Sequence, residues 1–173
     1  VFFALYENAF GNIPPQSKND RILTTTYVQF GGKIFSRISS PGYVLLKHYL
    51  KLHKLPRIEG ASIYSSHKPV ELLFRGRAIK VYRKRTDGNF WKIFDFRFLK
   101  GRPLTADDEK NSNYVAVINE STQKKLFGNK NPLGALIELD GQPFRIIGVV
   151  PDVPALRDRP FADVWVPLST SKT

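Results

Sequence analysis

The densest group of chemically active side chains in the sequence is a basic run, consisting of Arg75, Arg77, Lys80, Arg83, Lys84 and Arg85. The surrounding residues predict a strand, on which side chains two positions apart point to the same face. Four arginines share that parity: Arg75, Arg77, Arg83 and Arg85. We interpret this face as a contact surface for a partner protein or for anionic lipid headgroups. The alternative is a solvated basic surface that binds no polyanion.

Nucleic acid is the competing ligand for such a surface. Tyr82 is an aromatic residue within the run, whereas single-strand binding uses several stacked aromatic rings. We therefore expect no nucleic acid partner. A basic nucleic-acid-binding α+β module is kept only as the alternative function. We also expect reversal of the charges of Arg83 and Arg85 to leave the fold intact while altering partner or vesicle association.

The side chains that carry out catalysis or bind metals are sparse. The three histidines are His48, His53 and His67, and the first two are five residues apart rather than the four of a helical metal pair. There is no cysteine, and the motifs for serine nucleophiles, phosphate loops and zinc are absent. The acidic group Asp107-Asp108-Glu109 fits the first turn of a helix. We therefore predict no enzyme activity and no catalytic, cofactor-binding or metal-binding residues.

Composition indicates a globular chain with an uneven charge. The 173 residues are 42% hydrophobic and 13% aromatic, which is enough for one ordinary domain or two small lobes. The net charge is +12. Residues 1–104 contribute +13, from 19 basic and 6 acidic side chains, and residues 105–173 contribute −1, from 8 basic and 9 acidic ones. This asymmetry favours two lobes.

The ends of the chain suggest an excised fragment. It begins on apolar residues with no initiator methionine, and methionine is absent throughout. No apolar run reaches the 18 or so residues that a membrane-spanning helix needs. We expect the natural sequence to continue beyond both ends.

The first half of the chain predicts a strand–helix–strand order. Residues 21–30 are rich in β-branched and aromatic types, typical of a strand. An amphipathic helix is predicted from Pro41 to the residue before Pro56, because apolar side chains recur at helical spacing. Two strands should follow at 58–65 and 70–83, with a turn between them.

The second half alternates short helices and strands. Phe90, Ile93 and Phe94 have the spacing of a short helix with a buried aromatic face. A helix should start after Thr105, and Asn119 should cap another over 120–127. Asp140-Gly141 predicts a tight hairpin turn. The strands expected here are 114–118, 135–139, 144–150 and 163–167.

A series of motifs in order resembles a known family over residues 88–168. They are NFWKIF at 89–94, FLKGRPL at 98–104, VAVINE at 115–120, KLFG at 125–128, NPLG at 131–134, and FRIIGVV at 144–150 with Asp152. This pattern resembles the extracytoplasmic core domain of MacB-like ABC transporter permeases, a group that includes FtsX-like and Lol-type permeases. Residues 8–21 are similar to the segment that follows the first membrane helix in such permeases, whereas 22–87 match no motif.

The resemblance implies an α+β domain held in the periplasm between two helices of the cytoplasmic membrane. A porter-like lobe of β-α-β units with a mixed sheet is expected over 1–104 and 159–173. A smaller inserted α/β lobe with the β-hairpin is expected over 105–158. The implied role is to couple ATP-driven movement of the membrane helices to export or mechanotransmission. The implied partners are a cytoplasmic ABC ATPase, a second permease copy and a periplasmic protein, with no cofactor.

Overall fold

The computed structural model describes residues 11–22, 27–30, 33–36 and 59–171. The helix predicted over 41–55 lies outside these residues. Of the strand predicted over 21–30, the structure describes β1 (Tyr27–Phe30), which pairs antiparallel with β2 (Lys33–Ser36) in a two-stranded sheet. Of the strand predicted over 58–65, residues 59–65 form only one isolated bridge, from Tyr64 to Thr86.

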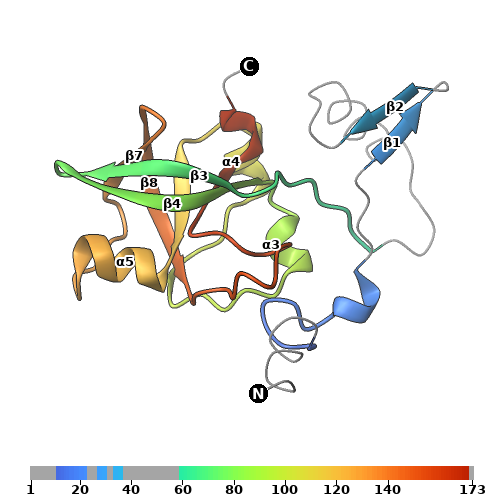
Figure 1. The fold of residues 1–173 in the computed structure, drawn as a ribbon, viewed down its shortest axis with the longest axis horizontal. Coiled ribbons are helices and arrows are strands. Elements are labelled where there is room, and N and C mark those ends of the chain that lie inside the picture. Colours follow the sequence, from blue (N-terminus) through green and yellow to red (C-terminus); the bar gives the residue numbers. More distant parts are fainter. Residues whose placement is uncertain (1–10, 23–26, 31–32, 37–58, 172–173) are drawn as a thin grey trace.

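A seven-stranded mixed sheet organises the rest of the chain (Figure 1). Its strands are β3 (Lys68–Phe74), β4 (Arg77–Thr86), β5 (Lys100–Gly101), β6 (Val115–Asn119), β7 (Leu136–Leu139), β8 (Gln142–Val150) and β9 (Val164–Pro167). Their order is β5-β8-β6-β9-β4-β3-β7, and β7 also pairs with β8, so the sheet closes on itself. The β4–β9 and β6–β8 pairs are parallel, and the other pairs are antiparallel. The predicted α+β fold with a mixed sheet is confirmed.

The sheet joins the two segments that were expected to form separate lobes. Strands β3, β4 and β9 come from the predicted porter-like lobe, whereas β6, β7 and β8 come from the predicted inserted lobe. The pairings β3–β7 and β6–β9 cross between these segments. A boundary at residue 104 would thus run through one hydrogen-bonded sheet, and the two-lobe division stays a prediction.

Short helices lie between and beside the strands. They are α3 (Phe90–Ile93), α4 (Ala106–Lys110) and α5 (Glu120–Phe127), with the single-turn helices η1 (Asn19–Arg21) and η2 (Leu168–Thr170). The Asn119 side chain accepts a hydrogen bond from the Thr122 N–H at 2.9 Å, so the predicted cap of α5 is confirmed. The predicted helix start at 105–108 is confirmed, and Thr105 caps α4 in a capping box with Asp108.

The core lies on both faces of the central strand β9. Val164 and Val166 pack on one face, in a cluster that includes Leu72 and Ile118. Trp165 packs on the other face, in an aromatic cluster with Phe90, Trp91 and Phe94. All four residues of β9 are buried, as expected for a strand covered on both sides. The predicted aromatic core face of α3 is confirmed.

Two tight turns shape the sheet, and only one was predicted. Asp140 and Gly141 have φ of 53° and 72°, which confirms the β7–β8 hairpin. The strand predicted over 70–83 is wrong, because Arg75 and Gly76 form a second such turn, with φ of 48° and 74°, between β3 and β4. Arginine at positive φ is uncommon. The pair Arg-Gly therefore lacks the strong hairpin signal of Asn-Gly or Asp-Gly.

Replacing Gly141 by valine is expected to destabilise the chain by about 1–3 kcal/mol. The reason is backbone strain, because a β-branched residue is strained at φ of 72°. A Cβ added there would meet no atom within 4 Å, so no steric clash contributes. Urea unfolding measures the change. An unchanged midpoint and slope would contradict the role given to this turn.

Candidate functional site: a basic pocket beside α5

The four arginines singled out from the sequence occupy opposite ends of the β3–β4 hairpin. Arg75 lies in the turn and Arg77 begins β4, and both side chains are exposed. Arg83 and Arg85 lie near the other end of β4 and are partly buried. The structure therefore does not bring the four side chains together as one surface.

Arg83 and Arg85 contact other parts of the fold. Arg83 forms an ion pair with Asp140 of the β7–β8 turn, and its side chain is only 11% exposed. Arg85 donates from Nη1 to Thr170 Oγ1 of η2 at 2.9 Å. Burial, with the nearby Arg83 charge, lowers the pKa of Arg85 to about 10.

These contacts bear on the proposed charge reversal. A reversal of both charges would place two carboxylates beside Asp140. The structure thus gives no support to the expectation that the reversal leaves the fold intact. A partner or headgroup contact through all four arginines stays a prediction.

Arg75 and Arg77 border a cavity of about 620 Å³ between the β3–β4 turn and the C-terminal end of α5. We call this cavity the basic pocket. Its cationic lining residues are Arg75, Arg77, Lys124, Lys125 and Lys130. Its apolar lining residues are Phe74, Leu126, Phe127 and Ala135, and Gly128 and Asn131 complete it. The described lining residues include no carboxylate.

Aromatic rings form the apolar part of the basic pocket. The ring centroids of Phe74 and Phe127 are 4.4 Å apart, which joins β3 to α5. The Arg75 guanidinium carbon lies 5.3 Å from the centroid of the Phe74 ring, within the range of a cation–π contact. The pocket thus combines a positive rim with an aromatic base.

Most of the positive charge in the basic pocket is not neutralised by ion pairs among the described residues. Lys124 pairs with Glu120 at 3.0 Å, one helical turn away, and both side chains are well exposed. Such exposed pairs contribute little. Within the described part of the chain, no carboxylate lies in ion-pair distance of Arg75, Arg77, Lys125 or Lys130.

The three lysines of the basic pocket were not singled out from the sequence. Lys124 and Lys125 belong to the last turn of α5, where cations are expected to complement the helix dipole. Nothing in the local sequence indicated that Arg75 and Arg77 lie beside them. The β3–β4 turn brings these arginines close to the lysines, and the residue pattern of the segment did not predict that turn.

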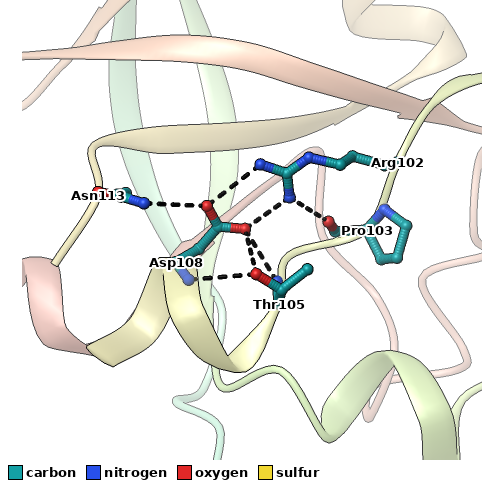
Figure 2. A network of polar contacts seen from close by, with 5 residues as sticks. All are labelled: Arg102, Pro103, Thr105, Asp108 and Asn113. Carbon is teal, nitrogen blue, oxygen red and sulfur yellow. Dashed lines mark hydrogen bonds and ion pairs between the residues drawn. The ribbon is translucent and has the colours of Figure 1, made fainter. Parts of the chain in front are cut away.

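The acidic group near residue 108 is a structural network (Figure 2). Asp108, 3% exposed, accepts hydrogen bonds from Arg102 at 2.6 and 3.2 Å, from Asn113 at 3.2 Å, and from the N–H and Oγ1 of Thr105 at 3.0 and 2.9 Å. Burial alone would raise the pKa of Asp108. The hydrogen bonds from Arg102, Thr105 and Asn113 outweigh burial and hold this pKa well below its usual range. Glu109 accepts from the N–H and Oγ of Ser169 at 3.1 and 3.2 Å.

The described residues offer no cluster typical of a metal site. Among residues 11–22 and 59–171, no three His, Asp or Glu side chains are placed to hold a metal ion. His67 lies against the rings of Tyr82 and Phe161, whereas His48 and His53 fall outside the described part of the chain. No described helix has the length and apolar character needed to cross a membrane.

Comparisons with known proteins give consistent results. The family model described as the MacB-like periplasmic core domain matches residues 1–173. A macrolide export ATP-binding/permease protein MacB from Aggregatibacter actinomycetemcomitans is 50% identical over 74 residues, which are 39% of this chain and 12% of that protein. The chain thus spans a small part of the length of such relatives.

Two solved structures have similar folds. The periplasmic region of MacB from Actinobacillus actinomycetemcomitans has a TM-score of 0.58 at 27% identity, over 72% of this chain and 55% of that one. The extracellular domain of the transporter YknZ from Gram-positive bacteria has a TM-score of 0.58 at 19% identity, over 70% of this chain and 60% of that one. These matches give the nucleic-acid-binding alternative no support.

Proposed function

Because the chain belongs to the MacB-like periplasmic core domain family, we propose that it couples ATP-driven movement of flanking membrane helices to export. The family match over residues 1–173 is the observation that carries this proposal. The chain represents a periplasmic domain of a MacB-like ABC transporter permease. Three further statements are part of the proposal. They are that the domain couples helix movement to transport, that the transport is export, and that the helices lie in the cytoplasmic membrane.

We further propose the partners that this role requires. They are a cytoplasmic ABC ATPase acting through the membrane helices, a second permease copy and a periplasmic protein. The MacB relatives are named as ATP-binding/permease proteins, which supports the first of these. We expect the domain itself to catalyse no reaction and to work by transmitting motion.

Coupling needs mechanical continuity between the segments near both ends of the chain and the sheet, and the contacts of these segments support it. Arg157, 2% exposed, donates to the carbonyls of Ile13 and Gly11 at 2.8 and 3.0 Å. Ser17 donates to Asp95 from both its N–H and its hydroxyl. At the other end, Arg85 and Glu109 hold Thr170 and Ser169. Movement of either segment would therefore be passed to the sheet.

In the full transporter, replacing Arg157 by methionine is expected to lower export strongly while ATP hydrolysis continues. The change removes the two hydrogen bonds to residues 11 and 13 but keeps most of the apolar length of the side chain. Arg97→Met is the matched control, because Arg97 is exposed.

Export and ATPase rates should be measured together, at equal amounts of transporter in the membrane. Normal export by the Arg157 variant would argue against coupling through this segment. The milder variant Ser17→Ala, which removes a hydroxyl donor to Asp95, should lower export in the same direction.

A further inference from the structure

The basic pocket is not explained by the role of a motion-transmitting domain. A domain that only transmits movement needs packed elements and firm connections, and the pocket supplies neither. It leaves four cations without an ion-pair partner among the described residues, around a half-buried aromatic base. Like charges gathered in this way repel one another, so the arrangement is unfavourable unless something neutralises it.

The simplest structural explanation accounts for only part of the pocket. Lys124 and Lys125 lie in the last turn of α5 and stabilise the negative end of its dipole. Arg75 and Arg77 come from a different element, the β3–β4 hairpin. These two arginines add positive charge at a helix end where the lysines already stabilise the dipole. Stabilisation of the dipole therefore does not explain the arginines.

The size and lining of the pocket define the ligand that fits it. A volume of about 620 Å³ lies within the range of pockets for small molecules. Guanidinium and ammonium groups bind phosphate, sulfonate and carboxylate through charge-assisted hydrogen bonds. Phe74, Phe127 and Leu126 offer apolar contact beside these groups. The pocket therefore matches a molecule with an acidic group at one end and an apolar body at the other.

We propose that the basic pocket, formed by the β3–β4 turn and the end of α5, binds a small anionic amphiphile. The acidic group would contact Arg77, Lys125 and Lys130, and the apolar body would lie against Phe74 and Phe127. Soluble amphiphiles and membrane lipids share this chemistry. The volume of about 620 Å³ suits a whole small molecule, which favours a soluble ligand over the headgroup of a lipid held in a bilayer.

Two dyes with the same ring system separate the charged from the apolar contribution. The probe is 1-anilinonaphthalene-8-sulfonate, and N-phenyl-1-naphthylamine is its neutral counterpart. Fluorescence titration of the 173-residue chain at about 150 mM salt, where long-range attraction is screened, should show one saturable site for the sulfonate. The neutral dye should bind at least about tenfold more weakly. Equal affinity for both dyes would show an apolar groove without anion selectivity.

Matched variants test whether the effect belongs to the pocket. The pocket variant is Arg77→Gln, Lys125→Gln and Lys130→Gln, and the control is Lys80→Gln, Lys92→Gln and Lys110→Gln. Both remove three exposed positive charges. We expect the pocket variant to weaken sulfonate binding by about tenfold or more and the control by less than about twofold. Equal losses would show that net charge alone draws the dye, and would overturn the proposal.

Further measurements locate the site and identify the source of the ligand. Amide chemical shifts should change on sulfonate binding mainly in 74–77 and 124–131, and changes centred elsewhere would refute the assignment. Decyl phosphate below its micelle concentration should displace the dye. In a co-sedimentation assay with phosphatidylglycerol vesicles, the parent chain and the pocket variant should pellet to the same extent. Vesicle binding that depends on the pocket, without displacement by decyl phosphate, would replace the soluble ligand with a bilayer lipid.

This proposal is independent of the coupling role. The binding assays use the chain without membranes, so loss of export in the Arg157 variant leaves them unchanged. Failure of sulfonate binding would in turn leave the coupling proposal standing.

Discussion

Replacing Gly101 by alanine should destabilise the chain by about 4 kcal/mol or more, which is exceptional for the addition of one methyl group. Gly101 has φ of 69°, and a Cβ built there would lie 2.0 Å from the Ile147 carbonyl oxygen and 2.9 Å from Leu133 Cδ2. The first contact is with backbone of β8, which rotation of a side chain cannot relieve. Either the β5–β8 pairing opens or β8 shifts inside the closed sheet.

The control for this change is Gly141→Ala. Gly141 has a similar φ of 72°, but no atom lies within 4 Å of an added Cβ. Gly141→Ala should therefore destabilise the chain by only about 1–2 kcal/mol, which is the cost of placing alanine at positive φ. Thermal unfolding of both variants measures the difference, with a shift of more than about 8 °C for Gly101 and under about 8 °C for Gly141. Equal shifts would mean that the crowding at β8 is absent.

Replacing Asp108 by asparagine should destabilise the chain by about 2–4 kcal/mol at neutral pH. Asparagine has nearly the same shape, but its amide N–H₂ would face the donors that now meet the second carboxylate oxygen. The control is Asp107→Asn, an exposed residue in the same first turn of α4. That change removes only the interaction with the helix dipole, worth under about 1 kcal/mol.

The effect of Asp108 should depend on pH in a defined direction. Its pKa is lowered in the folded protein, whereas in the unfolded chain it should be near the ordinary value of about 3.9. The carboxylate therefore contributes its full stabilisation above about pH 4, and this is lost as the pH falls toward the folded-state pKa. Urea unfolding from pH 7 to pH 3 should show the gap between parent and Asp108→Asn narrowing below about pH 4. A constant gap would indicate that the charge of Asp108 is not responsible.

Local sequence was sufficient for most elements between residues 88 and 168. Asn119 caps α5 as predicted, and α4 begins at the acidic turn where a helix start was predicted, because both signals involve groups only three residues apart. The Asp140-Gly141 turn was predictable for the same reason. The Arg75-Gly76 turn was not, because arginine has no intrinsic preference for positive φ and the surrounding residues suit a strand throughout.

The closure of the sheet and the basic pocket were beyond the reach of local pattern. β7 pairs with both β3 and β8, and neither partner is indicated by the alternation within β7 itself. The parity that placed four arginines on one face was a sound rule for a single strand. It could not show that Asp140 would cover Arg83 or that α5 would bring three lysines to Arg75 and Arg77. These placements depend on contacts between residues that are far apart in the sequence.

The position of β9 determines how the domain would respond to tension. β9 is hydrogen-bonded to β4 on one side and β6 on the other, and Leu168 follows it directly. Ladder hydrogen bonds run across the strands, so a pull along β9 loads both ladders in shear, and their bonds must rupture together. A pull across the strand would instead unzip them one at a time. Tension applied beyond Pro167 in line with β9 would thus displace the whole sheet before it extracted the strand.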